Sequence, residues 1–198
     1  MIVTKKAQEL SAPAVLGNNQ IVENFSLYKN IGSKGAVVFF YPKDFTFVCP
    51  SEIIAFDKRY KDFKERGIEL IGVSCDNEFS HFAWKNTAIE NGGIGNVQFP
   101  LVADLKKEWA RAFDVLFDEA VALRGSFLLD KDGTVRHAVI NDLPLGRNID
   151  EMIRMVDTML FTNEHGEVCP AGWHKGQAGM KADPKGVAEY LKQNASKL

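Results

Sequence analysis

The strongest pattern in the chain is a pair of short apolar runs separated by a segment with helical periodicity. Residues 36–41 are rich in β-branched and aromatic side chains, which is typical of a strand buried on both faces. Across residues 50–66 apolar side chains recur at helical spacing, with Pro50 suited to the first helical position and Gly67 to the stop. Residues 68–74 form the second apolar run. The pattern predicts a strand, a helix and a strand, with a crossover long enough for parallel pairing.

The same alternation continues along most of the chain. The further strands that we expect are residues 99–102, 127–129 and 135–140. The further helices that we expect are residues 79–88, 106–113 and 150–161. A turn at residues 130–133 should join the last two strands into a hairpin. Together these elements predict an α/β fold, in which a central mixed sheet is flanked by helices.

The character of the sequence changes after residue 161. Residues 162–185 are rich in glycine, histidine and lysine and are expected to form an extended arm. The arm should end in a short helix that is capped by Asp183, followed by Pro184, and that runs through Tyr190. We therefore expect an α/β domain over residues 1–161 and a C-terminal arm over residues 162–198.

The composition is that of an ordinary globular protein. The chain has 198 residues, 45% of them hydrophobic and 25% charged, and this length can bury a full core without disulfide cross-links. A formal net charge of -2 gives no basis for binding nucleic acid. The N-terminus lacks the apolar segment of a signal peptide, and no apolar run approaches the roughly 20 residues of a membrane span. We expect a cytoplasmic protein that binds neither nucleic acid nor membranes.

Candidate chemistry begins with three cysteines, Cys49, Cys75 and Cys169, an odd number that is too small for a disulfide scaffold. Cys49 directly precedes Pro50, so its sulfur should lie at the start of the predicted helix, where unpaired amide hydrogens favour an anion. The hydroxyl of Thr46 could turn toward the same sulfur. A small buried hydrophobic side chain is the alternative for Cys49, and position alone does not decide between the two.

The segment around Cys49 contains the pattern Pro42-x-x-x-Thr46-x-x-Cys49, which closely resembles the peroxidatic motif of peroxiredoxins. Four further segments resemble the typical two-cysteine class of that family, namely residues 92–95, 123–125, 144–148 and 166–170. Within the class, the sequence most resembles the bacterial alkyl hydroperoxide reductase C group and its thioredoxin-linked relatives. The resemblance covers nearly the whole chain and implies a thioredoxin-like fold with an extended C-terminal arm.

The resemblance implies a role for each residue of the motif. Cys49 would attack a hydroperoxide and become a sulfenic acid. Thr46 would hydrogen-bond the thiolate and the peroxide, and Pro42 would close the pocket. Arg124 would lie over the thiolate and stabilise the charge that develops as the oxygen–oxygen bond breaks. Without Cys49, we would interpret Thr46 as a turn residue, Pro42 as a strand terminator and Arg124 as a surface charge.

The resemblance also implies supporting residues around Arg124. Glu52 and Arg147 resemble a pair that orients Arg124 beside the sulfur. A solvated helix face and a loop charge explain the two residues nearly as well.

Cys169 lies in a polar segment, and the resemblance implies that it is the resolving cysteine. It would attack the sulfenic acid of the neighbouring subunit, so that a homodimer joined by intersubunit disulfides is the minimal functional unit. A ring of five dimers, common in the family, is neither indicated nor excluded by the sequence. Thioredoxin or a dedicated flavoprotein disulfide reductase would reduce the disulfide. No bound cofactor is implied, because sulfur carries the electrons.

Resolution should require the first turn of the helix at Cys49 to unwind. Residues 92–95 (Gly-Gly-Ile-Gly) and the pair Tyr190-Leu191 resemble two elements that slow this unwinding and expose the sulfenic acid to overoxidation. The family's common Tyr-Phe pair is Tyr-Leu here, which speaks against high sensitivity.

The same scaffold allows two other functions. Large assemblies of such subunits could act as holdase chaperones, which bind unfolded protein and would do so even after Cys49→Ser. A dithiol–disulfide oxidoreductase on the same scaffold would prefer a Cys-x-x-Cys pair, and the chain has none.

The remaining cysteine and histidines do not indicate a further site. His165, Cys169 and His174 are three candidate zinc ligands without an evident fourth, so no metal is expected. Cys75 matches no catalytic motif and is expected to be inert. His81, like His137, is expected to serve packing or hydrogen bonding.

Overall fold

The computed structural model describes residues 2–197 of the chain. Its contacts divide the chain into two compact units, one that ends at Ile149 and one that starts at Asp150. Helix α5 (Ile149–His165) runs across residue 161, where the sequence suggested the division, because its helical periodicity continues for one more turn. The division into residues 1–161 and 162–198 stays a prediction.

The first unit contains nine strands, four α-helices and two short 3₁₀ helices within the described residues. The strands are β1 (Ser11–Val15), β2 (Ile21–Ser26), β3 (Gly35–Phe40), β4 (Ile68–Ser74), β5 (Leu101–Ala103), β6 (Leu116–Phe117), β7 (Val121–Ala122), β8 (Arg124–Asp130) and β9 (Val135–Asn141). The helices are α1 (Cys49–Lys58), α2 (Tyr60–Glu65), α3 (Glu78–Lys85) and α4 (Glu108–Ala112), with 3₁₀ turns η1 (Tyr28–Asn30) and η2 (Ile89–Asn91).

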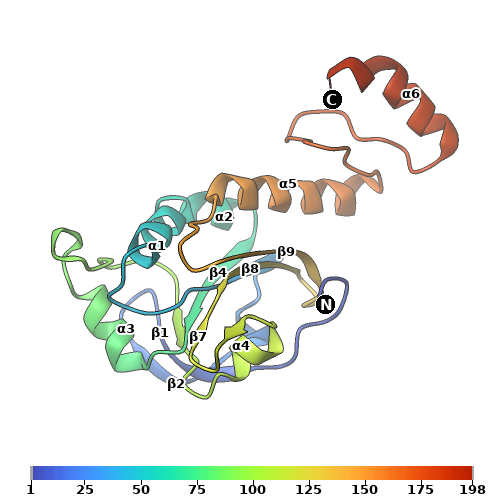
Figure 1. Cartoon of the computed structure of the whole chain (residues 1–198). Coiled ribbons are helices and arrows are strands. Elements are labelled where there is room, and N and C mark those ends of the chain that lie inside the picture. The colour runs from blue at the N-terminus through green and yellow to red at the C-terminus, as the bar shows by residue number, and fades with distance from the viewer. Residues whose placement is uncertain (1, 198) are drawn as a thin grey trace. The chain divides into compact units, whose positions relative to one another are not determined.

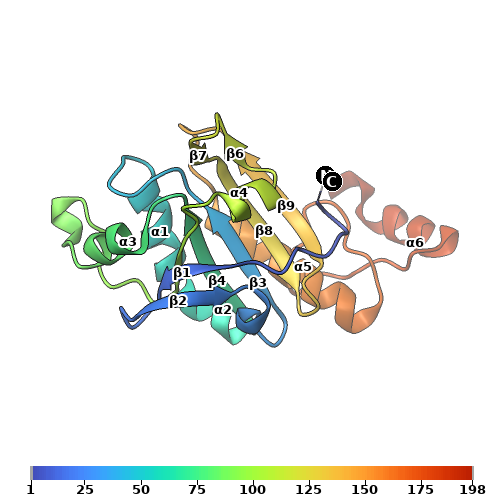
Figure 2. The same cartoon turned by 90° about the horizontal axis from the view of Figure 1, so that it is seen from below.

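Seven of these strands form one mixed sheet in the order β2-β1-β5-β4-β3-β8-β9 (Figure 2). The strand β4 pairs in parallel with β3 on one side and with β5 on the other, and the remaining neighbours are antiparallel. The predicted parallel pairing across the first helical crossover is therefore confirmed. The hairpin of β8 and β9 is confirmed as well. Strands β6 and β7 form a separate two-stranded ribbon.

Helices cover both faces of the sheet, as the sequence predicted (Figure 1). All six residues of β3 are buried, and successive side chains point to opposite faces. On one face Phe39 stacks on Phe56 of α1 with ring centroids 4.1 Å apart. On the other face Phe40 packs at 5.2 Å against Phe113, directly after α4. Strand β3 thus lies in the centre of the core, and it leads directly into the loop that precedes Cys49.

The single helix predicted over residues 50–66 is wrong in one respect, because the structure has two helices there. Helix α1 ends at Lys58, the following residue Arg59 has a φ of -100° and a ψ of 4° that are not helical, and α2 starts directly after it. The Arg59 amide donates to the Phe56 carbonyl, a tighter closure than the α-helical one. The break leaves both Phe56 and Phe63 fully buried, with ring centroids 6.2 Å apart.

The second unit consists of α5, a connecting segment, α6 (Pro184–Asn194) and the 3₁₀ turn η3 (Ala195–Lys197). Asp183 caps α6, because its side chain accepts a 2.7 Å hydrogen bond from the amide of Gly186. The predicted start of this helix is confirmed, and the helix extends four residues beyond the predicted end at Tyr190. None of the helices in residues 2–197 is long and apolar enough to cross a membrane.

Candidate active site

Cys49 is the first residue of α1, and its side chain is fully buried. The predicted position of the sulfur at a helix start is therefore confirmed. The amides of Ser51 and Glu52, however, both donate to the carbonyl of Val48, at 3.1 and 3.4 Å. Two side chains, those of Thr46 and Arg124, make direct polar contacts with the sulfur.

The hydroxyl of Thr46 lies 3.0 Å from the sulfur of Cys49, as the sequence predicted, and 2.7 Å from the carbonyl oxygen of Lys43. A hydroxyl has a single proton to donate. When Cys49 is a thiol, the Thr46 proton can go to Lys43 while the hydroxyl oxygen accepts from the S–H group. When Cys49 is a thiolate, only donation to the sulfur makes the 3.0 Å contact favourable. The hydroxyl can therefore serve both states of the cysteine.

Arg124 is the first residue of β8, and its buried guanidinium lies against the sulfur. Its Nη1 is 3.4 Å from the Cys49 sulfur and 2.7 Å from Oε2 of Glu52. Its Nε donates to the carbonyl of Leu143 at 2.7 Å. These bonds fix the plane of the guanidinium from two sides, so one N–H group is aimed at the place where the sulfur reacts.

Arg147 and Glu52 form the layer behind Arg124. The Nε of Arg147 is 2.8 Å from Oε1 of Glu52, and its Nη2 is 2.9 Å from Oε2, which is the bidentate geometry of a strong ion pair. The Nη1 of Arg147 donates to the carbonyl oxygens of Phe40 and Gly125 at 2.8 and 2.7 Å. The alternative of two solvated charges is wrong, because both side chains are only 3% exposed.

The charges in this cluster determine which form of the sulfur fits. Burial alone would raise the pKa of the Glu52 carboxyl, but the hydrogen bonds and charges of the two guanidiniums outweigh it and lower the pKa. Glu52 is therefore an anion at neutral pH. Two guanidiniums and one carboxylate leave one positive charge in a buried space, and a thiolate at Cys49 neutralises it.

The predicted site also includes Pro42 and Cys169. Pro42 is half-buried at the start of the loop that leads to Cys49, and its closing of the pocket stays a prediction. Cys169 is half-buried in the second unit, and its sulfur is 3.9 Å from the carbonyl of Thr158. Burial raises the pKa of the Cys169 thiol, although the charge of Arg154 acts in the opposite direction. All three cysteines of the chain are free thiols.

Sequence reasoning did not identify a buried polar network beside the loop. The Tyr41 hydroxyl donates to Oδ1 of Asp44 at 2.9 Å, and Nδ1 of His81 lies 2.8 Å from Oδ2 of the same carboxylate. The amide of Asp44 in turn donates to Asp76 at 2.9 Å. The only sequence signal was the closeness of Asp44 to Thr46, because His81 is separated from the motif by more than thirty residues.

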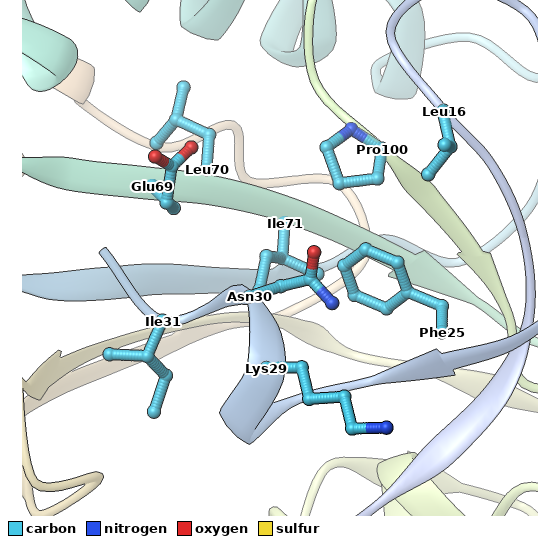
Figure 3. Close-up of a pocket in the computed structure, with 9 residues that line it drawn as sticks. All are labelled: Leu16, Phe25, Lys29, Asn30, Ile31, Glu69, Leu70, Ile71 and Pro100. Atoms are coloured by element: carbon cyan, nitrogen blue, oxygen red, sulfur yellow. The ribbon is translucent and has the colours of Figure 1, made fainter. Parts of the chain in front are cut away.

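The chain also has a cavity of about 280 Å³ away from the cysteine (Figure 3). Phe25, Ile31 and Pro100 supply part of its apolar lining, while Lys29 and Glu69 bring opposite charges to its wall. The residues that line the cavity include none of those that contact Cys49. Within residues 2–197, no three His, Cys, Asp or Glu side chains gather in a way that could hold a metal ion.

Comparison with protein families gives two matches that together cover most of the chain. The model described as "AhpC/TSA family" matches residues 3–138, and the model described as "C-terminal domain of 1-Cys peroxiredoxin" matches residues 159–193. Among curated proteins, the alkyl hydroperoxide reductase C of Helicobacter pylori is 67% identical over the whole length of both chains. A chloroplastic 2-Cys peroxiredoxin, BAS1 of Hordeum vulgare, is 45% identical over 96% of this chain and 90% of its own.

Solved structures give the same result. The reduced 2-Cys peroxiredoxin of Plasmodium vivax superposes with a TM-score of 0.94 at 44% identity, over 97% of this chain and 99% of that one. The AhpC of Enterococcus faecalis superposes with a TM-score of 0.78 at 32% identity, over 85% of this chain and 99% of its own. The predicted thioredoxin-like fold is confirmed by these structures and by the family match.

Proposed function

This chain belongs to the AhpC/TSA family and to its two-cysteine peroxiredoxins, and we propose that it is a thiol peroxidase that reduces hydrogen peroxide and organic hydroperoxides. The observation that carries the proposal is the contact of the buried Cys49 sulfur with both the Thr46 hydroxyl and the Arg124 guanidinium. The names of the relatives describe a reductase and peroxiredoxins, so they support this activity and not the alternative of a holdase.

The first step oxidises Cys49. Its thiolate attacks the terminal peroxide oxygen, the sulfur–oxygen bond forms and the oxygen–oxygen bond breaks. The leaving oxygen takes a proton and departs as water or an alcohol, and the cysteine becomes a sulfenic acid. Negative charge moves from the sulfur to the leaving oxygen during this step. Arg124 can follow that movement, because its guanidinium already lies 3.4 Å from the sulfur and is held there by Glu52.

The second step joins two subunits. The Cys169 thiolate of one subunit attacks the sulfenic sulfur of the other, a disulfide forms, and hydroxide leaves and is protonated to water. A reductant then returns two electrons, and thioredoxin or a flavoprotein disulfide reductase has the required chemistry. The half-buried position of Cys169 in a segment outside regular helices and strands suits both encounters.

A homodimer is the smallest assembly that can complete this cycle, and a ring of five dimers would repeat it. Aromatic side chains exposed beside the catalytic loop are consistent with further subunit contacts, since Phe47 is 95% and Phe79 68% exposed. The predicted cytoplasmic location stays a prediction.

The proposal is tested by single-turnover peroxide consumption with the prereduced protein, without any reductase. We expect rapid loss of about one peroxide per subunit and, on a non-reducing gel, a dimer band that depends on Cys49. Cys169→Ser should still consume the first equivalent but form no such dimer. The proposal fails if Cys49→Ser consumes peroxide as fast as the natural protein does.

A further inference from the structure

His81 is a fully buried histidine whose two ring nitrogens both face acceptors. Its Nδ1 lies 2.8 Å from Oδ2 of Asp44, and its Nε2 lies 3.2 Å from the carbonyl oxygen of Val102 in β5. Both side chains of the pair are almost completely buried, at 0% and 1% exposure. A carbonyl oxygen has no proton to give, so Nε2 must carry one.

The second proton of the pair lies between Nδ1 of His81 and the carboxyl of Asp44. Two arguments favour the ring. An imidazole holds a proton more firmly than a carboxylate in water, and the other oxygen of Asp44 accepts the Tyr41 hydroxyl at 2.9 Å, which favours its anionic form. Burial, followed by the charge of Asp44, raises the pKa of the Tyr41 phenol, so Tyr41 keeps its proton for this bond. This arrangement fits a His81 ring that donates from both nitrogens, to Asp44 and to Val102.

This ion pair is attached to the loop that carries the reactive cysteine. Asp44 lies two residues before Thr46, and its amide is held by Asp76 at 2.9 Å. The next residue, Phe45, has a φ of 52°, a left-handed conformation that is strained for a residue with a side chain. Such strain persists only where neighbouring contacts hold the backbone. The hydrogen bonds of Asp44 hold the backbone on one side of Phe45.

Helix α3, which carries His81, also holds two other parts of this region. The ring of Trp84 lies 5.7 Å from that of Phe45, and its Nε1 donates to the carbonyl of Gly92 at 2.9 Å. The amide of Ile94 donates to the Trp84 carbonyl at 3.3 Å. One turn of α3 thus binds the loop before Cys49 and the Gly-Gly-Ile-Gly segment together.

We propose that His81 is a positioning residue that fastens the loop before Cys49, through its ion pair with Asp44, in the arrangement that reacts with peroxide. The inference rests on the proposed peroxidase function. Unwinding the first turn of α1 for resolution requires this loop to move, and moving Asp44 away from His81 breaks a fully buried hydrogen bond. The pair therefore slows disulfide formation and lengthens the life of the sulfenic acid.

The charge state is tested first, on the natural protein with nitrogen-15 in its histidines. NMR at neutral pH should show both ring nitrogens of His81 protonated, with His81→Gln used to assign its signals among the four histidines. An unprotonated Nδ1 would place the proton on Asp44 and overturn the proposal. This measurement does not depend on catalysis or on any variant's stability beyond the assignment.

The kinetic test compares His81→Gln and Asp44→Asn, which each alter one partner of the buried pair, with Glu78→Gln, which removes a charge from the same helix outside the network. After one peroxide equivalent, disulfide formation should be about tenfold faster in the first two variants, the factor that loss of one hydrogen bond to a charged group allows. The yield of sulfinic acid at a fixed peroxide concentration should fall correspondingly. Glu78→Gln should match the natural protein.

Unchanged resolution rates in both variants of the pair would overturn the positioning role. Where either variant fails to fold, as judged by circular dichroism, the other variant and the NMR result decide. The proposed peroxidase function fails separately, since in that case the natural protein itself would show no Cys49-dependent peroxide consumption.

Discussion

The side chain of Arg124 is held in one orientation by its hydrogen bonds. Its guanidinium contacts the sulfur, the Glu52 carboxylate and the Leu143 carbonyl at the same time. These three contacts leave it little freedom to reorient during the reaction. Its contribution should therefore depend on the fork shape of the guanidinium as well as on its charge.

Arg124→Ala should lower the rate of the first peroxide reaction by about 10²- to 10³-fold, as loss of a preorganised donor does in other enzymes. Arg124→Lys keeps the charge but has no counterpart of Nε, which donates to the Leu143 carbonyl while Nη1 faces Glu52 and the sulfur, so it should recover only part of the rate. Stopped-flow measurement of single turnovers checks both variants. A lysine variant as fast as the natural protein would show that charge alone matters.

Cys75 is the opposite case, a thiol that its surroundings keep unreactive. It is half-buried and packs against the hydrophobic core. Burial, and to a lesser extent the charge of Asp104, raises its pKa to about 11. The expected inert packing role is consistent with these surroundings.

Iodoacetamide at neutral pH should therefore leave Cys75 largely unmodified in the folded protein, and Cys75→Ala should consume peroxide at the natural rate. Peptide mass spectrometry after a timed reaction checks the first expectation, and the single-turnover assay checks the second. Unfolding the protein in urea should make Cys75 reactive, which serves as the control. Rapid labelling in the folded state would contradict the assignment.

At the scale of elements, Glu52 holds the first turn of α1 in place through its hydrogen bonds. It lies three residues after Cys49. Glu52 accepts hydrogen bonds from Arg124 and from three nitrogens of Arg147, including its backbone amide. Glu52→Gln would leave two buried guanidiniums without their counter-charge. Removal of one partner from a buried ion pair costs about 3–5 kcal/mol in the free energy of unfolding.

The stabilisation by Glu52 should depend on pH in a defined direction. Its pKa is lowered from 4.5 in the folded protein, so the unfolded chain binds more protons in this range. The contribution is complete above pH 4.5 and is lost as the pH falls through the folded-state pKa. Urea unfolding should therefore show a large difference between the natural protein and Glu52→Gln at pH 7 and a smaller one in acid.

Glu65→Gln is the matched control, because the ion pair of Glu65 with Lys61 is exposed, at 60% and 88% of the side chains. It should change stability by less than about 1 kcal/mol at either pH. Equal effects of the two substitutions would contradict the role of Glu52.

The elements that the sequence predicted well share a physical property. Strands β3 and β4 are continuous apolar runs with clear turn signals, and their bounds agree with the prediction within one residue. The hairpin of β1 and β2 was not predicted, because β1 contains a proline and its burial does not alternate regularly. The break at Arg59 was not predicted either, since it depends on tertiary packing of Phe56 and Phe63.

The residues of the candidate site also differ in how far the sequence could predict their proximity. Thr46, Cys49 and the helix start are close in sequence, so their proximity could be predicted from local structure alone. Arg124 and Arg147 come from distant segments, and they and the nearby Glu52 were found only through the resemblance to a family. The pairing of His81 with Asp44 had neither kind of signal, because it requires the fold to bring α3 against the loop.

At the scale of the whole molecule, the proposed cycle needs two chains, and mixing two inactive variants tests this directly. Cys49→Ser retains only the resolving thiol, and Cys169→Ser retains only the peroxidatic one. Dimers exchanged between the two should contain one complete Cys49–Cys169 pair. With random pairing they should recover about a quarter of natural turnover in the presence of a reductant.

Recovery would be absent if the disulfide formed within one chain, because neither variant carries both cysteines. Each variant unfolded and refolded alone serves as the control for the exchange procedure. A disulfide-linked dimer on a non-reducing gel should appear in the mixture and in neither control.

The balanced charges around Cys49 have a consequence for what happens after the reaction. Two guanidiniums, one carboxylate and a thiolate sum to zero net charge. Conversion of the thiolate to a neutral sulfenic acid removes one negative charge and leaves Arg124 and Arg147 facing a single carboxylate in a buried space. The sulfenic acid thus forms in a site whose charges match the thiolate and not the acid. Oxidation thus leaves a net positive charge at the buried site, and this charge opposes the arrangement that the thiolate favours.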